Sequence, residues 1–256
     1  MHCFSAISLS LHRKTEGMKP KRIILIRHIE SKARIYWNVL GVRLGIRKVL
    51  PADFINGIKV IECKEPLEKL YNDENLFITD DQIFVGRKSM IERLMKAAKE
   101  VSQQGCRLHI FQTYRSPEEQ AERRTDTYER LKGRHPHCGE EEIRRMLNKA
   151  VAGVGGGHQT GGAVDLSLCD KGGRMLDMGT QYREHNLKTT THSKELNEDE
   201  RRNRMILVEA MQRAGFVNYP AEWWHFSYGD KMWAAYKFKR HAIYGITYWD
   251  NPSRCD

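Results

Sequence analysis

With 256 residues, 40% of them hydrophobic and 30% charged, the chain has the composition of an ordinary globular protein and is long enough to bury a core without disulfide or metal staples. Its net charge of +10 comes from Lys and Arg residues that alternate with Glu and Asp along the whole length, which argues against a nucleic-acid partner. No apolar run approaches the ~20 residues that cross a bilayer, so we expect no membrane partner.

The cysteines and the N-terminus bear on the compartment. Six cysteines are scattered without a C-x-x-C pair, a pattern that favours free thiols in a reducing compartment. No basic segment and no small-residue cleavage site mark a secretory signal, so we expect a cytoplasmic protein. Met18 is a candidate for the true start, and residues 1–17 would then be a disordered extension.

Residues 1–62 are expected to form an N-terminal extension, and residues 63–250 a catalytic domain. Within the extension, residues 22–26 are expected to form either a short buried strand or an extension that packs elsewhere. Residues 35–49 mix apolar and basic side chains without a clean period, so no element is predicted there.

The first clear helix signal lies at Ser89, which with Glu92 matches the capping-box pattern and is predicted to be an N-cap. Apolar residues recur at helical spacing as far as Val101, and Gly105 is suited to end the helix. A strand over residues 108–111 follows.

Three further helices are predicted. One begins after the N-cap Ser116 and runs to about Lys132, and another covers residues 140–151. The capping pattern at Asn197 predicts a helix that Gly215 ends.

A strand is predicted over residues 163–168, which alternate in character. The turn sequence at 170–173 then predicts a hairpin in which residues 174–177 return beside this strand. There is no internal repeat and no low-complexity linker, so a single α+β domain with a small antiparallel sheet flanked by helices is the simplest fold.

His158 and Asp165 are the first candidate metal ligands. A carboxylate in an otherwise apolar strand is costly unless it is paired or bound to a cation. His158 precedes the strand, across two glycines that permit a sharp bend. Imidazole and carboxylate from one loop-strand unit suit Zn²⁺, which accepts nitrogen and oxygen ligands.

His225 and Glu222 supply what a hydrolytic zinc site still needs. Such a site has three protein ligands, an open position and a base beside it. His225 is the candidate third ligand, and Glu222, three residues earlier among aromatic side chains, is the candidate base. Arg115, at the end of a predicted strand, is placed to stabilise the negative charge that develops on the carbonyl oxygen.

These segments resemble the VanX-type D-alanyl-D-alanine dipeptidases, within the wider group of zinc D,D-peptidases. The family pattern S-x-H-x-x-G-x-A-x-D is matched from His158 to Asp165, and E-x-W-H by Glu222 to His225. The further matches are Tyr114-Arg115 and Asp177-Met178-Gly179-Thr180. The resemblance covers roughly residues 65–245, in the family's order.

The resemblance implies a Hedgehog/DD-peptidase-like fold with one Zn²⁺ per chain and a short peptide as substrate. It implies that Tyr114 and Asp177 lie on the substrate side, with Asp177 near the substrate's free amino group. One position departs from the pattern: Gly156 stands where the family has a serine that lies near the substrate.

Several simpler readings stay open. Arg115 could be a structural ion-pair partner, Asp177 could stabilise a turn, and the His135-Pro136-His137-Cys138 cluster is expected to be a solvated loop, because a zinc site there lacks a fourth ligand. Among functions, hydrolysis of D-Ala-D-Ala or a similar dipeptide is favoured. The alternatives are a zinc D,D- or L,D-carboxypeptidase or endopeptidase of peptidoglycan stem peptides, a non-catalytic zinc-binding module, and a basic nucleic-acid binder.

Overall fold

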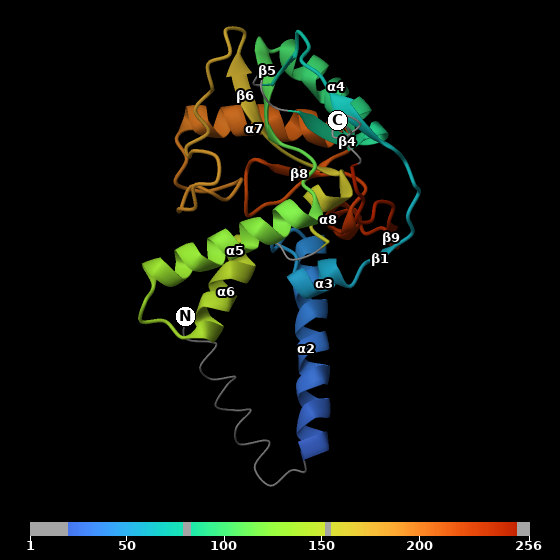
Figure 1. Ribbon diagram of the computed structural model, residues 1–256, viewed down its shortest axis with the longest axis vertical. Coiled ribbons are helices and arrows are strands. Elements are labelled where there is room, and N and C mark those ends of the chain that lie inside the picture. The colour runs from blue at the N-terminus through green and yellow to red at the C-terminus, as the bar shows by residue number, and fades with distance from the viewer. Residues whose placement is uncertain (1–19, 79–82, 152–154, 250–256) are drawn as a thin grey trace, which may run out of the picture. The chain divides into compact units, whose positions relative to one another are not determined.

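The computed structural model describes residues 20–78, 83–151 and 155–249, with side chains from residue 31 onward apart from 149 and 150 (Figure 1). Met18 and the extension expected over residues 1–17 lie outside these ranges. The chain divides into two compact units, Met1–Phe54 and Ile55–Asp256. The assignment of residues 1–62 to an extension and of 63–250 to a catalytic domain stays a prediction, because compactness does not assign a function to either part.

The first described element is the helix α2, Pro20–Arg43, and the short helix α3, Ala52–Asn56, follows it. The strand predicted at residues 22–26 is therefore wrong. A run of four apolar residues, Ile23 to Ile26, fits a buried strand and a helix segment equally, and only its surroundings decide. Here Pro20 occupies the first helical position, which its fixed φ suits. None of the helices over the described residues is long and apolar enough to cross a membrane.

The second unit is built around a five-stranded sheet of order β3-β5-β6-β8-β7. Its strands are β3 (Leu76–Phe77), β5 (Cys106–Gln112), β6 (Ala163–Asp170), β7 (Val217–Asn218) and β8 (His225–Ser227). All neighbouring pairs are antiparallel except β3 and β5, which are parallel. The predicted α+β class is confirmed, with one parallel pair at the edge of an otherwise antiparallel sheet.

Two small sheets flank the central one. The strands β2 (Leu67–Leu70) and β4 (Phe84–Arg87) pair antiparallel, and β1 (Lys59–Val60) pairs parallel with β9 (His241–Ala242). Between β8 and β9 lies the short helix α8, Lys231–Tyr236.

Four longer helices cover the sheet and one end of it. They are α4 (Lys88–Ser102), α5 (Pro117–Arg134), α6 (Glu140–Ala150) and α7 (Glu198–Arg213). The helices α4 and α7 pack against each other, α4 contacts β5, and α7 crosses the strands β5 and β6 (Figure 1). The helices α5 and α6 form a separate pair.

Two of the three predicted N-caps are confirmed. Ser116 accepts a hydrogen bond from the Glu119 amide at 3.1 Å, and Asn197 accepts one from the Glu200 amide at 2.8 Å. The prediction for Ser89 is wrong, because α4 begins at Lys88 with Arg87 at the N-cap position, and the Ser89 hydroxyl donates to the Glu65 carboxylate. This tertiary hydrogen bond takes the place of the predicted local one, in which the hydroxyl would accept from a backbone amide.

The hairpin predicted after β6 is present only in part. The Asp170 amide donates to the Arg174 carbonyl and the Leu176 amide donates to the Leu168 carbonyl, both at 2.9 Å. A single bridge, Cys169 with Met175, takes the place of a full partner strand.

The core fixes the strand that carries a predicted ligand. In β6 the apolar residues Val164, Leu166 and Leu168 are fully buried on one face, and Asp165 is 5% exposed on the other. Trp223 and Trp224, just before β8, are buried as well. Apolar packing therefore anchors β6 and β8, the strands that carry the candidate ligands Asp165 and His225.

Candidate metal centre

Asp165 and His225 face each other across two paired strands. The β6–β8 register sets Asp165 directly opposite His225. Cross-strand partners in an antiparallel pair project to the same side of the sheet. The His225 Nδ1 atom consequently lies 2.8 Å from Asp165 Oδ1.

His158 reaches the same point from the 3-10 turn η1, Gly157–Thr160. Gly161 ends this turn with φ +70°, a left-handed conformation that favours glycine, and turns the chain into β6. His158 Nε2 lies 3.2 Å from Asp165 Oδ1, while its Nδ1 lies 2.6 Å from the Thr113 carbonyl oxygen. A carbonyl can only accept, so Nδ1 carries the proton and Nε2 presents its lone pair to the site.

These three residues fit a metal ion. One ligand atom from each of His158, Asp165 and His225 lies within 4.8 Å of the other two. Two imidazole nitrogens and one carboxylate oxygen form a donor set that suits zinc, and three protein ligands leave a coordination position open. The sequence prediction that two distant segments meet here agrees with this geometry.

Burial and close contact perturb all three groups. Burial opposes ionisation of Asp165, yet the two histidines hold its pKa well below the usual range. Burial lowers the pKa of His158. Burial also works against charge on His225, but the hydrogen bond and the negative charge of Asp165 outweigh it and raise the pKa of that imidazole. Such a cluster of perturbed groups is typical of functional sites.

A second layer of contacts surrounds the ligands. Tyr182 donates its hydroxyl to Asp165 Oδ2 at 2.7 Å. Ser227 Oγ lies 3.4 Å from His225 Nε2 and donates to the buried Asp230 carboxylate at 2.8 Å. Outer contacts of this kind fix the orientation of ligand side chains. Tyr182, Ser227 and Asp230 were not predicted from the sequence, since each reaches the ligands only through the fold.

Glu222 lies in the turn between β7 and β8, where its carbonyl accepts from the His225 amide at 3.3 Å. Its carboxyl group interacts electrostatically with His225 and Asp165. Burial raises the pKa of Glu222; His225 opposes this rise and Asp165 adds to it. A carboxylate held in this way can take up and return a proton, which suits a general base.

Arg115 is joined to the site by its backbone and by charge. Its amide donates to the His158 carbonyl at 3.1 Å, and its Nη1 donates to Gln120 at 2.6 Å. Burial, followed by the like charge of Arg123, lowers the pKa of Arg115 to about 10. The guanidinium therefore stays charged at neutral pH, as an oxyanion-stabilising role requires.

The other two predicted site residues have structural contacts. Tyr114 donates its hydroxyl to the Thr247 carbonyl at 2.9 Å. The Asp177 carboxylate accepts from the Gly179 amide at 2.7 Å, which stabilises the turn there. Among the described residues, no hydrogen bond or ion pair joins either side chain to the three ligands. Their roles in substrate binding stay predictions.

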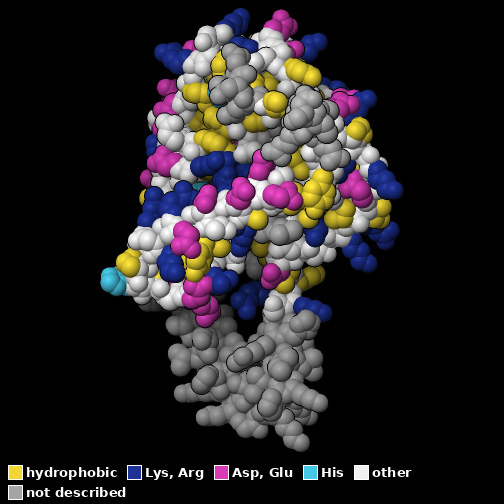
Figure 2. Space-filling view, viewed as in Figure 1, with side chains coloured by type: hydrophobic (Ala, Val, Ile, Leu, Met, Phe, Trp, Pro, Cys, Tyr) yellow, Lys and Arg dark blue, Asp and Glu magenta, His cyan; other side chains and the backbone are white. Residues whose placement is uncertain are grey.

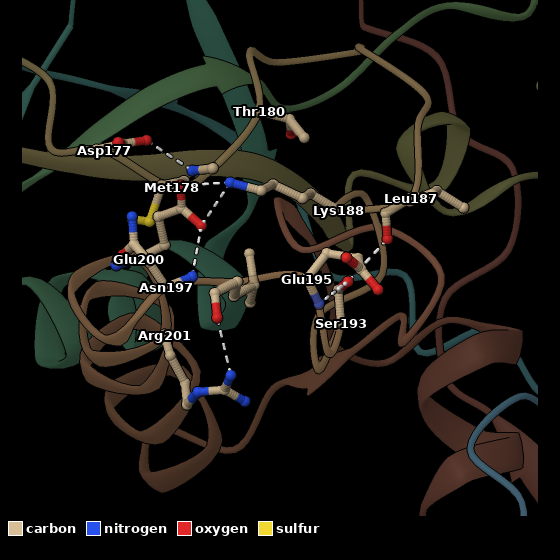
Figure 3. Close-up of polar contacts among 12 residues, drawn as sticks. Asp177, Met178, Thr180, Leu187, Lys188, Ser193, Glu195, Asn197, Glu200 and Arg201 are labelled. Carbon is tan, nitrogen blue, oxygen red and sulfur yellow. Dashed lines mark hydrogen bonds and ion pairs between the residues drawn. The ribbon is translucent and has the colours of Figure 1, made fainter.

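The segment after β6 is fastened by a polar network around Glu200 (Figure 3). Lys188 Nζ lies 2.7 Å from Glu200 Oε1, and the Asn197 amide donates to the same carboxylate at 3.0 Å. Ser193 donates to the Leu187 carbonyl at 2.8 Å. These contacts fix residues 187–200, the part of the segment that follows Tyr182.

The His135-Pro136-His137-Cys138 cluster lies in the turn region between α5 and α6, as expected for a loop. Over the described residues, His158, Asp165 and His225 form the only group of three or more His, Cys, Asp or Glu side chains that is placed to hold a metal.

Curated relatives share sequence with parts of this chain. A D-alanyl-D-alanine dipeptidase of Synechocystis sp. is 38% identical over 95 residues, which are 33% of this chain and 38% of that protein. The Escherichia coli enzyme of the same name is 38% identical over 73 residues, 28% of this chain and 38% of that protein. The Enterococcus faecium enzyme is 25% identical over 153 residues, 57% of this chain and 74% of that protein. The first two matches thus span about two fifths of the relatives' length.

Solved structures with some similarity include a VanY D,D-pentapeptidase of a VanB-type vancomycin resistance cassette in complex with Zn(II). It has a TM-score of 0.43 and 18% identity, and the match covers 73% of this chain and 86% of that one. An LdcB LD-carboxypeptidase has a TM-score of 0.42 and 19% identity over 69% of this chain and 73% of that one.

The sequence family described as D-Ala-D-Ala dipeptidase, peptidase family M15, matches residues 74–243. This range contains β5, β6 and β8 and all three candidate metal ligands. The chain belongs to the D-Ala-D-Ala dipeptidase family of metallopeptidases.

Proposed function

We propose that this protein is a zinc-dependent peptidase that hydrolyses D-Ala-D-Ala or a similar short dipeptide containing D-amino acids. The observation that carries the proposal is the convergence of His158, Asp165 and His225 within 4.8 Å, with Glu222 beside them. Membership of the family and the names of the relatives support the substrate class. The cytoplasmic location and the absence of nucleic-acid and membrane partners stay predictions.

The three ligand side chains would hold one zinc ion. When bound, zinc supplies Lewis-acid polarisation of the scissile carbonyl and of a water molecule. His158 is prepared for this role because the Thr113 carbonyl fixes its tautomer. His225 is prepared by the Asp165 carboxylate on one side and the Ser227 hydroxyl on the other.

Glu222 is the proposed general base. Its carboxylate removes a proton from the attacking water and then delivers that proton to the leaving amine, so the side chain ends the cycle as it began. Its raised pKa suits both transfers. Arg115 is the proposed electrostatic stabiliser, since its buried guanidinium remains charged while the carbonyl oxygen gains negative charge.

The test combines metal analysis with an assay of D-alanine release. The purified protein should contain about one zinc per chain and should hydrolyse free D-Ala-D-Ala faster than a stem pentapeptide; the reverse order would favour the carboxypeptidase alternative. Glu222→Gln should keep its zinc and lose turnover. Glu209→Gln is the matched control, because that carboxylate is 58% exposed on α7. Near-full activity of Glu222→Gln, or a protein that takes up no metal, would refute the proposal.

A further inference from the structure

Three arginines meet beside the metal centre. Arg115 lies just before α5, Arg123 lies within α5, and Arg183 comes from the segment after β6. The electrostatic neighbours of Arg115 include Arg123, Arg183 and Asp165. Figure 2 shows Lys and Arg side chains along α5 and between it and the strands above, with Asp and Glu side chains among them. Of the three arginines, only Arg115 was predicted from the sequence.

Arg183 is tied to the residues that flank Asp165. Its Nη2 donates to Gln112 Oε1 at 3.1 Å, and Gln112 is the β5 residue paired with Asp165. Its guanidinium carbon lies 4.5 Å from the centre of the Tyr182 ring, whose hydroxyl donates to Asp165. Arg183 also has φ +64°, a conformation that a residue other than glycine adopts at a cost. The backbone is therefore strained at Arg183, the residue that carries this guanidinium group.

Arg123 lies on helix α5, a different element from the segment that carries Arg183. It lies three residues after Gln120 and four before Thr127, both buried, so the helix places it on the same face as these two. Its side chain is half-buried, and the hydrogen bonds and ion pairs of the described residues include none made by Arg123. Its electrostatic neighbours are Arg183, Tyr182, Asp165 and Glu222. Burial and Arg183 both lower the pKa of Arg123.

The local charges do not balance. The two acids among these electrostatic neighbours are Asp165 and Glu222, and both are assigned to metal binding and proton transfer. A divalent cation would offset these two negative charges, so neither acid would be left to pair with the arginines. Arg183 is exposed, whereas Arg115 is buried and Arg123 half-buried, so solvent screens the charges of these two less and they favour an anion more strongly.

We infer that Arg123 and Arg183 bind a carboxylate of the substrate, one that is separate from the scissile amide. The planar fork of a guanidinium matches a carboxylate, and two such groups from different elements can clamp one. The inference rests on the proposed function only for the identity of the bond that is cleaved. Binding of a carboxylate by the two arginines does not depend on it.

The carboxylate has two possible sources, the C-terminus of the peptide or an acidic group on its amino side. Three ligands separate them: N-acetyl-D-Ala-D-Ala, its neutral C-terminal amide, and N-succinyl-D-Ala-D-Ala amide, whose only carboxylate is on the amino side. Binding is measured by calorimetry in the zinc-loaded Glu222→Gln protein, which prevents turnover. At least one carboxylate ligand should bind about tenfold or more tightly than the neutral amide, as charge-assisted hydrogen bonds predict.

That advantage should disappear in both Arg123→Gln and Arg183→Gln, added singly to the same background. Arg183→Lys should retain part of it, because the charge remains. Arg202→Gln, which alters an arginine 66% exposed on α7, is the matched control and should retain all of it. Thermal denaturation of each variant shows that it is folded.

Equal binding of the neutral amide and both carboxylates would overturn the inference. So would a carboxylate advantage that survives in both Arg123→Gln and Arg183→Gln, because the carboxylate would then be bound elsewhere, such as on the metal. If the wild-type protein hydrolyses none of the peptides while the arginine-dependent binding is observed, the proposed function fails and the carboxylate site stands.

Discussion

The Nδ1 atom of His225 lies 2.8 Å from Oδ1 of Asp165, although 60 positions separate these residues in the sequence. The contact is a consequence of strand register, because β6 and β8 set the two residues directly opposite each other. A register slip of one residue would turn His225 to the other face of the sheet and dismantle the site. The geometry of the metal centre therefore depends on the pairing of β6 with β8.

Asp165→Asn should lose bound metal. The amide keeps the size of the side chain but removes the negative charge, leaving two neutral imidazoles that hold a divalent cation much more weakly. Metal content is measured by mass spectrometry after dialysis against zinc-free buffer. Asp199→Asn, an exposed carboxylate on α7, is the control and should bind zinc like the wild type. Full zinc occupancy in Asp165→Asn would exclude Asp165 as a ligand.

Ser227→Ala should weaken metal binding without removing a ligand. The hydroxyl lies between His225 Nε2 and the Asp230 carboxylate, so its loss frees the imidazole to rotate. Loss of such an outer contact typically weakens affinity by ~10–100-fold. Asp230 still accepts from the Trp233 amide, so α8 keeps its N-cap. Zinc affinity is measured by competition with a chromophoric chelator, and an unchanged value would show that Ser227 does not orient His225.

Arg115→Gln should lower kcat by about 100-fold or more, the usual effect of removing one oxyanion donor. Zinc should remain bound, because Arg115 supplies no ligand atom. Steady-state kinetics on D-Ala-D-Ala, together with metal analysis of the same sample, checks both expectations. If kcat were unchanged, Arg115 would be a structural residue that holds Gln120.

Gly179→Ala should destabilise the fold. Gly179 has φ +86°, and a Cβ atom there would lie 2.9 Å from Leu196 and 3.0 Å from a Glu200 carboxylate oxygen. Backbone strain of this kind costs about 1–3 kcal/mol. Gly133→Ala is the control, since nothing lies within 4 Å of a Cβ there and alanine favours the helix α5. Urea denaturation compares the two, and equal stability of both variants would contradict the expectation.

The ion pair of Glu200 with Lys188 should make stability depend on pH. The hydrogen bond from Lys188 lowers the pKa of Glu200 below its ordinary value of 4.5. A carboxyl group whose pKa is lower in the folded than in the unfolded chain stabilises the fold above its unfolded pKa and loses this effect as the pH falls through the folded pKa.

Glu200→Gln should therefore be less stable than the wild type at pH 7, and the difference in unfolding free energy should shrink below about pH 4.5. Chemical denaturation across this range measures the difference. Glu198→Gln alters an exposed neighbour in the same turn and should preserve the wild-type pH profile. A difference that stays constant with pH would mean that the ion pair does not stabilise the fold.

The sequence alone determined the features that depend on neighbours along the chain. The caps at Ser116 and Asn197 were predictable because the donor and acceptor lie three residues apart. The strand that carries Asp165 was predictable from its alternation. The convergence of His158, Asp165 and His225 was predictable because a zinc site restricts which ligand types it can use, whereas the catalytic role of Glu222 stays a prediction.

Only the tertiary structure decided what depends on distant contacts. Residues 22–26 belong to a helix because of the segment around them, and Ser89 is no cap because its hydroxyl donates to the carboxylate of Glu65. Arg123 and Arg183 carry no local pattern that sets them apart from the chain's other arginines. They meet because α5 and the segment after β6 both fold over Asp165, and electrostatic interaction depends on distance in space rather than in sequence.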